Sequence, residues 1–390
     1  MRLWNYSTVM CADNTLGEVI EKFLPSLLQG RGVSKYQLKV LRALATCRTP
    51  ELGGSAMVCS DCGTVHYVLH SCRNRHCPRC QGIDKELWVE ARKQELLPVK
   101  YFHVVFTVPH ELLELFRFNR KVMYNLLFEK SWETLCLFAK DPKLLGAQPG
   151  AIAILHTWDQ QLRFHPHVHL IVPAGGIDKN RKWKSSKQNG DFLFDVKQMS
   201  NVFSARFAKK LRRLKRQGKI SKYVPRDLIK KPWVVYAKQA FGTAESVVEY
   251  LGRYTHRVAI SNARILKITG THVTFSWCDR ENGYQKKTET ISGVEFLKRF
   301  LDHIVPPYFR RIRHLGFLST RSKRQSLEAI RESLGEELVQ TAPLSRAQVL
   351  ELCFGKRSLL KCRECGGELK LLETWPGKRA PPVSAKAGIC

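Results

Sequence analysis

No apolar run in this sequence approaches the roughly 18–20 residues that a membrane-spanning helix needs. The first residues, MRLWNYSTVM, also lack the basic-then-apolar order of a secretory signal peptide. Acidic residues are scarce, because 34 Asp and Glu stand against 65 Lys and Arg and leave a formal charge of +31. These absences favour a cytoplasmic protein that does not enter a membrane. The excess of positive charge predicts a polyanionic partner, which we expect to be nucleic acid.

The sequence also has no GKS or GKT phosphate-binding loop, no internal repeat and no long low-complexity tract. Without such a loop, any unwinding of DNA would depend on a host helicase. Apolar residues make up 44% of the chain, which is ordinary for folded domains. Its 390 residues are enough for two or three of them.

Local patterns predict several elements. Strands are expected at 100–109, 151–160 and about 166–173, with the last two forming a hairpin. A long helix is expected over 110–139, and a hairpin over 264–291.

The cysteines are arranged for metal binding rather than for disulfides. Two CxxC pairs, Cys59/Cys62 and Cys77/Cys80, lie fourteen residues apart and predict one structural zinc ion held by four thiolates. Cys72 and His76 lie between the pairs, and either could replace a cysteine or bind a second ion. The neighbouring arginines suit docking on DNA: Arg73, Arg75 and Arg79.

A third pair, Cys362 and Cys365, is a lone half-site that Cys353 could assist. We expect the remaining cysteines to be plain thiols: Cys11, Cys47, Cys136, Cys278 and Cys390.

Histidines alternate in RFHPHVHLIVPAGG, residues 163–176. In a strand, His167 and His169 would share one face, about 7 Å apart, while Val168 points into the core. Two such imidazoles can bind one metal ion. Pro166 is expected to turn the chain before the strand begins, which leaves His165 in a flanking position. Taken alone, the stretch favours a solvated row of histidines.

Two tyrosines occur in EYLGRYTHR, within a helix expected from Ala244 to about Thr255. Tyr250 and Tyr254 are four residues apart, so they would lie on one helix face. Arg253 and Arg257 beside them suit phosphate contact. In isolation the better interpretation of the pair is packing.

A basic helix and loop at 206–231 hold twelve Lys and Arg and one acidic residue. Its cations are predicted to bind phosphates without reading bases: Lys209, Lys210, Arg212, Arg213, Lys215 and Arg216.

Together these motifs resemble one family. HPHVHLIVPAGG is similar to the HUH motif, YLGRYTHRVAIS to the two-tyrosine motif, and CRNRHCPRCQ to an N-terminal zinc segment. HVVFTVPHEL resembles the first conserved strand of the same proteins. Between about residues 20 and 320, the chain resembles the rolling-circle transposases of insertion-sequence family ninety-one and the related common-region elements.

The resemblance implies an α+β nuclease core, in which helices flank a central antiparallel sheet, with an N-terminal zinc-binding module. It implies Mg²⁺ or Mn²⁺ at His167 and His169 with a third ligand, either Gln161 or His156. It also implies that one tyrosine attacks single-stranded DNA at an element end and forms a 5′-phosphotyrosine, which a target strand later resolves. Such a protein would act in the bacterial nucleoid.

We expect three segments: a helical and zinc-binding DNA-docking domain at 1–98, the HUH domain at 99–325, and a C-terminal tail at 326–390. Two other functions stay open from the sequence. One is an HUH replication initiator or relaxase of a plasmid or phage. The other is a zinc-dependent DNA-binding protein without enzymatic activity.

Overall fold

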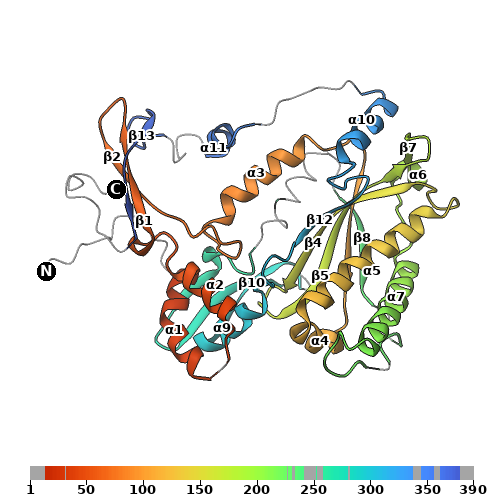
Figure 1. Ribbon diagram of the computed structural model, residues 1–390, viewed down its shortest axis with the longest axis horizontal. Helices are drawn as coiled ribbons and strands as arrows, with labels where there is room; N and C mark the ends of the chain where they lie inside the picture. The colour runs from red at the N-terminus through yellow and green to blue at the C-terminus, as the bar shows by residue number, and fades with distance from the viewer. Residues whose placement is uncertain are drawn as a thin grey trace.

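The computed structural model describes residues 14–30, 32–225, 227–230, 233–240, 252, 258–279, 282–336, 344–354 and 361–377. The molecule is elongated, with a small sheet at one end and a large sheet at the other (Figure 1). None of the helices within these residues has the length and apolar character that a membrane crossing requires.

The largest sheet among the described residues is antiparallel, in the order β7-β6-β4-β5-β3-β8, with β12 beside β4. The expected strands at 100–109, 151–160 and 166–173 correspond to β3, β4 and β5, and β4 and β5 form the expected hairpin. The predicted α+β class is therefore confirmed. The strands are β3 (Tyr101–Thr107), β4 (Gln148–Trp158), β5 (Phe164–Pro173), β6 (Gly175–Ile177), β7 (Trp183–Ser185), β8 (Val235–Ala240) and β12 (Ile312–Gly316).

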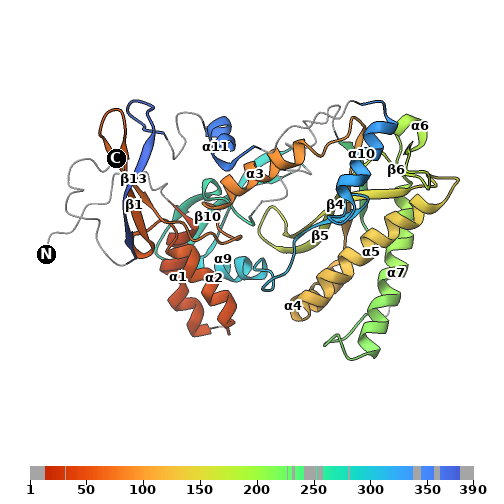
Figure 2. The same cartoon turned by 45° about the horizontal axis from the view of Figure 1, so that its top comes forward.

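Two long helices, α5 (Arg120–Lys140) and α7 (Val196–Arg216), cover one face of this sheet (Figures 1 and 2). Side-chain alternation explains the contact, because every second side chain of each strand points to this face, including Val104 of β3 and Val168 of β5. They share one buried core with apolar side chains of both helices, including Phe203 and Phe207 of α7.

The opposite face carries the other parity of side chains, including Tyr101, Ile154 and Ile171. Its core also contains Trp88 from α3 (Gln81–Lys93) and Ile330 from α10 (Lys323–Ser333). Each sheet face thus has its own helical layer, and the helices that cover this second face come from distant parts of the chain.

A second subdomain packs α1 (Leu16–Gly30), α2 (Lys35–Ala45) and α9 (Gly293–Asp302) against a sheet of order β11-β10-β9. Ser34 caps α2 and forms a capping box with Gln37. The stretch 264–291, expected to be a hairpin, is three-stranded: β9 (Ile265–Ile268), β10 (His272–Asp279) and β11 (Gln285–Ser292). A short 3-10 turn, η3 (Asn262–Arg264), precedes β9.

The helix expected over 110–139 is broken at Asn119, whose backbone leaves the helical region. The amide side chain of Asn119 donates to the Leu115 carbonyl and thereby satisfies the end of the first piece. The pieces are η2 (His110–Leu112), α4 (Leu113–Phe118) and α5.

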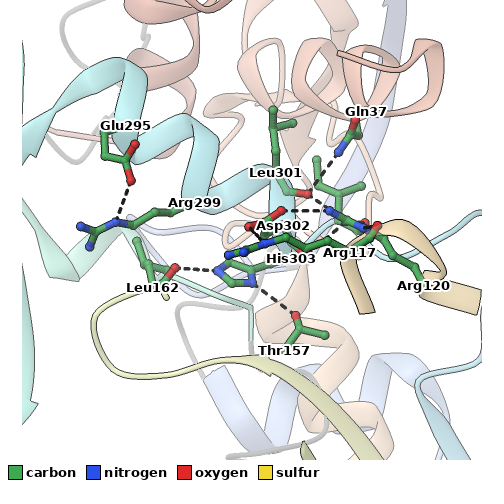
Figure 3. Close-up of polar contacts among 11 residues, drawn as sticks. Gln37, Arg117, Arg120, Thr157, Leu162, Glu295, Arg299, Leu301, Asp302 and His303 are labelled. Carbon is green, nitrogen blue, oxygen red and sulfur yellow. Dashed lines mark hydrogen bonds and ion pairs between the residues drawn. The ribbon is translucent and has the colours of Figure 1, made fainter. Parts of the chain in front are cut away.

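The C-terminal end of α9 joins the subdomains (Figure 3). The Asp302 carboxylate is bound by Arg117 at 3.0 Å and by Arg120 at 3.0 Å. The guanidinium of Arg120 also donates to the carbonyls of Leu301 and Asp302, the last two residues of the helix, and to the carbonyl of Ile304 just beyond it. The last carbonyls of a helix lack a following turn to bond with, so the arginine serves as a side-chain cap.

His303 lies beside this cap and is fully buried. Its Nε2–H donates to the Leu162 carbonyl at 3.0 Å, and its Nδ1 lies 3.3 Å from the Thr157 hydroxyl. The loop between β4 and β5 is thereby tied to α9. Gln37 of α2 completes the junction by donating to Leu301.

The small sheet has the order β13-β1-β2 and pairs a segment from the first part of the chain with one from the last part. Its strands are β1 (Gly53–Cys59), β2 (Val65–Leu69) and β13 (Leu369–Pro376). The remaining elements are η1 (Pro50–Leu52), α6 (Lys187–Gly190) and α11 (Arg346–Phe354), the last lying against α3.

Candidate functional site

Three histidines meet on the face of the large sheet that α3 and α10 partly cover. His167 and His169 project from β5, and His156 of β4 is the cross-strand partner of His167. Their candidate ligand nitrogens all lie within 4.8 Å of one another. His156 and His169 are buried and His167 is half-buried. Such a cluster can place three nitrogen ligands around one divalent ion.

The structure brings His167 and His169 together, as strand alternation requires, but it does not bring Gln161 to them. The Gln161 amide donates to the Glu289 carboxylate at 3.3 Å, on the side of the β9–β11 sheet. Gln161 is therefore corrected as the third-ligand candidate, and His156 takes its place. His156 reaches the cluster because the register of the β4–β5 ladder sets it opposite His167.

The expectation that Pro166 turns the chain before the strand begins is wrong, since β5 already starts at Phe164. The ladder pairs His156 with His167 and Trp158 with Phe164, so two residues of β5 stand opposite one of β4. This bulge accommodates a proline, which has no N–H to give to the ladder.

Hydrogen bonds orient the two β5 imidazoles. The Nδ1–H of His167 donates to the His165 carbonyl at 2.7 Å, which leaves the lone pair of the ring on Nε2. His169 Nδ1 lies 2.7 Å from Nε2 of His103, a buried residue of β3, and the two rings stack. The sequence reasoning missed His103, although a histidine in the strand HVVFT was a visible signal.

One exposed aromatic ring adjoins this cluster. Tyr236 of β8 packs edge-on against His103, with ring centroids 6.3 Å apart, and is 47% exposed. In the ladder, Lys238 of the same strand is the partner of His103. An aromatic ring and a cation beside this histidine cluster suit a single-stranded nucleic acid.

The tyrosine motif lies outside the described residues, apart from Gly252. This exclusion covers Tyr250, Tyr254, Arg253, Arg257 and the helix expected from Ala244 to about Thr255. Gly252 itself is buried against α3, and a Cβ added there would lie 2.5 Å from a methyl carbon of Val89. Because α3 covers the histidine-bearing face, Gly252 connects the motif to the layer on that face.

The cysteines form two clusters rather than one. Cys77 and Cys80 lie with Cys47 and Cys72, and the sulfurs of this group are all within 4.8 Å of one another. Sγ of Cys47 is 3.5 Å from that of Cys77 and 3.6 Å from that of Cys80. Cys47, expected to be a plain thiol, is therefore a member of a four-cysteine group, and Cys72 is another.

Cys59 and Cys62 lie instead with Cys362 and Cys365. The predicted site of Cys59, Cys62, Cys77 and Cys80 around one ion is therefore wrong. The physical reason is the β1–β2 hairpin, which carries the turn at 59–62 away from the turn at 77–80. The side chain of Cys353, a possible helper, lies outside the described residues.

His76 lies in neither cluster. Its Nε2 has no hydrogen-bond partner among the described residues. Burial, together with the positive charges of Arg311 and Arg75, holds the pKa of His76 well below its usual range. Its role as an alternate zinc ligand is thus not supported by the geometry.

Two of the three arginines of this segment, Arg75 and Arg79, are turned inward, whereas Arg73 is exposed. Arg75 donates to the carbonyls of Phe309 and Pro306, and Arg79 donates to the carbonyl of Cys47 at 2.7 Å. Both therefore hold the cysteine-bearing loop before α3 in place, although the sequence favoured a role for them in DNA docking.

Local hydrogen bonds favour the thiolate form of some of these cysteines. Contacts with the side chain and backbone of Thr64 lower the pKa of Cys62 to about 6. A hydrogen bond with Cys72, and a smaller effect from one with Cys77, lower the pKa of Cys47 to about 7. A thiolate is the form that binds metal.

The basic helix α7 lies on the sheet face opposite the histidines. Its apolar stripe packs on the sheet and α5, and its cations point outward: Lys209, Lys210, Arg212, Arg213, Lys215 and Arg216. Lys210 lies 3.7 Å from the Glu129 carboxylate of α5. The helix thus forms a positive surface remote from the histidine cluster.

Comparison with known proteins gives two family matches. Residues 19–108 match a family described as a transposase zinc-binding domain, and residues 150–326 match one described as a putative transposase. The first contains Cys47 to Cys80, and the second contains His156, His167, His169 and both tyrosines of the motif. Neither reaches Cys362.

Two relatives match nearly the whole chain. The putative transposase y4qJ of Sinorhizobium fredii is 39% identical over 375 residues, which cover 91% of this chain and 93% of the relative. The transposase for insertion sequence element IS801 of Pseudomonas savastanoi pv. phaseolicola is 28% identical over 355 residues, with coverage of 88% and 85%.

Proposed function

This chain belongs to the transposases of insertion-sequence family ninety-one, and we propose that it nicks and rejoins single-stranded DNA at element ends through a 5′-phosphotyrosine intermediate. The observation that carries the proposal is the cluster of His156, His167 and His169 on the central sheet. The tyrosine motif follows in the sequence, and Gly252 within it packs against the helix that covers the same sheet face.

The donor set fits a divalent metal ion. His156, His167 and His169 would hold it, with His167 offering Nε2 because its Nδ1–H is committed to a carbonyl. Nitrogen ligands suit transition-metal ions better than Mg²⁺, which prefers oxygen, so Mn²⁺ matches this site better. Such an ion would polarise a phosphate oxygen at the scissile position.

In the proposed reaction, the phenolic oxygen of Tyr250 or Tyr254 forms a bond to phosphorus. The bond between phosphorus and the 3′ oxygen breaks, the phenol loses its proton, and the departing 3′ oxygen takes one up. The DNA then has a free 3′-OH and a 5′ phosphate joined to tyrosine. Attack of a 3′-OH on this linkage reverses the step and rejoins strands, so no external energy source is needed. Two tyrosines allow donor and target ends to be held in one cycle.

The residues around the cluster support binding of a single strand. Tyr236 presents an exposed ring on which a base can stack, and Lys238 of the same strand can contact a phosphate. We propose that a host helicase provides the single strand, because the sequence has no phosphate-binding loop of its own.

We also propose that the cluster of Cys47, Cys72, Cys77 and Cys80 binds a structural zinc ion. The match to a zinc-binding family over residues 19–108 supports this assignment. Four thiolates close the coordination shell, so the ion would stabilise the loop before α3 and leave no position for substrate.

The proposed activity is tested with a labelled single-stranded element end and Mn²⁺. A covalent protein–DNA adduct should form, and it should be absent in His167→Ala and in the Tyr250→Phe/Tyr254→Phe double variant. The exposed His272 on β10 offers a matched control, so His272→Ala should retain the adduct. Cleavage by the double tyrosine variant would overturn the proposed nucleophile. Binding without any cleavage by the unaltered chain would indicate a DNA-binding protein without this activity.

A further inference from the structure

Four cysteines from distant parts of the chain meet between the β1–β2 turn and the turn that precedes β13. Sγ of Cys59 lies 3.4 Å from that of Cys365, and Sγ of Cys62 lies 3.7 Å from that of Cys362. Sulfurs around a tetrahedral zinc ion, each about 2.3 Å from the metal, stand about 3.8 Å apart. We propose that these four thiolates bind a second structural zinc ion, which joins the C-terminal segment to the N-terminal module.

The two turns have the same construction. Their sequences are CSDCG and CRECG, and the glycines after the second cysteine, Gly63 and Gly366, have φ of 71° and 80°. Each glycine N–H donates to the carbonyl of the first cysteine of its turn, at 3.1 and 2.9 Å. A glycine is favoured here because this left-handed conformation strains other residues. Two such turns facing one another are the usual way to complete a four-thiolate zinc site.

Backbone groups already point at the sulfurs. The N–H of Asp61 lies 3.4 Å from Sγ of Cys59, and the N–H of Gly367 lies 3.4 Å from Sγ of Cys365. Such donors stabilise the negative charge of thiolates, which favours metal binding.

The approach of the turns is fixed by packing around them. Ser60 N–H donates to the Glu368 carbonyl at 3.0 Å, which links one turn to the other. A side chain at Gly367 would collide with the Asp61 carboxylate and would lie 2.9 Å from Sγ of Cys59. In the adjoining ladder, Gly54 of β1 leaves room for the buried ring of Trp375 of β13.

A buried histidine supports the thiolates without joining them. His66 of β2 places Nε2 3.1 Å from Sγ of Cys362, within reach of an N–H···S hydrogen bond. A donor in this position orients the ligand and reduces its charge, which is the role of groups that surround a metal's direct ligands.

The two zinc sites would therefore interleave along the chain. Cys47 belongs to the first site, Cys59 and Cys62 to the second, and Cys72, Cys77 and Cys80 to the first again. The second site is complete only when residue 365 is present, far beyond the family match at 19–108. It would close a loop of about 300 residues. Closing a long loop lowers the conformational entropy of the unfolded chain, and this stabilises the folded chain relative to it.

Zinc content tests the second site without DNA, so its outcome is separate from that of the nicking assay. Purified full-length chain should hold two zinc ions in native mass spectrometry. The Cys59→Ser/Cys62→Ser pair, the Cys362→Ser/Cys365→Ser pair and the variant with all four changes should each hold one. The Cys136→Ser/Cys278→Ser control, which changes cysteines outside both clusters, should hold two. Two ions in the Cys362→Ser/Cys365→Ser variant would overturn the proposal.

A second measurement covers variants that fold poorly. A protease site placed within 337–343 lets the folded chain be cut after purification. Because β13 pairs with β1 and α11 lies against α3, the cut piece can also be held without zinc, so its release is measured by gel filtration at rising urea concentration. The piece should leave at a lower urea concentration when a chelator is present, and also in the cut Cys362→Ser/Cys365→Ser chain, than in the zinc-bound chain. Release of the serine variant at the same urea concentration as the zinc-bound chain contradicts the site.

Discussion

At the scale of single residues, the contact between His103 and His169 sets the orientation of a proposed metal ligand. His169 can offer Nε2 to an ion if its Nδ1–H donates to Nε2 of His103, and the 2.7 Å distance fits that bond. His103 is therefore a positioning residue, one strand away from the ligands. Loss of such a group costs about 10–100-fold in metal affinity.

The prediction for His103 follows from this bond. His103→Ala should raise the Mn²⁺ concentration needed for half-maximal nicking by about 10–100-fold, with the rate recovering at saturating metal. His103→Gln, whose amide oxygen can accept the same hydrogen bond, should recover most of the affinity. Nicking measured across a Mn²⁺ titration checks both. An equal loss in the two variants at every metal concentration would indicate a purely structural role.

The histidine site shows which residues a sequence can reveal. His167 and His169 follow from the period of a strand, because two residues of one strand have a fixed relation. His156 and His103 come from other strands, so their place depends on the register of β4 and β3 against β5, which local patterns do not encode. Cys47 was missed for a similar reason, since it stands alone in the sequence and meets its cluster only through the packing of α2 on the following loop.

At the scale of elements, α3 connects the sites. Cys80 stands directly before it, Gly252 packs on its middle, and α11 lies against it. Gly252→Ala would place a methyl group 2.5 Å from Val89, and overpacking of this kind costs about 1–3 kcal/mol. We therefore expect Gly252→Ala to slow adduct formation by about tenfold or more, because the tyrosine motif would shift relative to α3.

A compensating change makes this prediction specific. Val89→Ala removes the methyl group that the new side chain meets, so the Gly252→Ala/Val89→Ala double variant should recover much of the rate. Gly82→Ala in the same helix is the control, because a Cβ there meets nothing within 4 Å. Rates of adduct formation decide the matter, and a double variant as slow as Gly252→Ala alone would contradict the packing argument.

The elements themselves were largely predictable where local patterns are strong. The strands β3, β4 and β5 follow from β-rich runs bounded by turn residues. The basic helix expected within 206–231 corresponds to the second half of α7, which begins earlier, at Val196. The pairing of CxxC turns was not deduced, although a signal existed. The turns at 59–63 and 362–366 both continue with glycine, whereas Cys80 is followed by Gln81. Spacing along the chain favoured the nearer CxxC pair, but the pairing of β1 with β13 brings residues 53–59 beside residues 369–376.

At the scale of the whole molecule, the buried junction at the end of α9 ties stability to pH. Burial lowers the pKa of His303 to about 4, from an ordinary value near 6.5, and the surrounding charges of Asp302, Arg120 and Asp159 leave it low. The unfolded chain takes up this proton before the folded one as the pH falls, so stability is complete above about pH 6.5 and decreases toward pH 4.

His303→Gln tests this linkage, because the amide can still donate to Leu162 but cannot take up a proton in this range. From pH 7.5 to 5, His303 should account for about 2 kcal/mol of lost stability, at about 1.4 kcal/mol per pH unit. Urea unfolding at both pH values should therefore show a smaller decrease in His303→Gln than in the unaltered chain. Equal decreases would mean that His303 is not the responsible group.

The charge distribution of the molecule leads to the last prediction. The exposed cations of α7 lie on the face opposite the histidine cluster, so they can hold DNA without touching the scissile phosphate. Each phosphate contact to a single strand contributes about 0.7 to the slope of log affinity against log salt. We therefore expect weaker DNA binding and a slope shallower by about 2 in the α7 triple variant, Lys209→Gln/Arg213→Gln/Arg216→Gln. Its nicking rate at saturating DNA should stay unchanged. The control removes the same charge from another exposed surface, on α1 and α2, and is Lys22→Gln/Lys39→Gln/Arg42→Gln. If both triple variants change the slope equally, net charge alone governs binding, and α7 is not the surface that holds DNA.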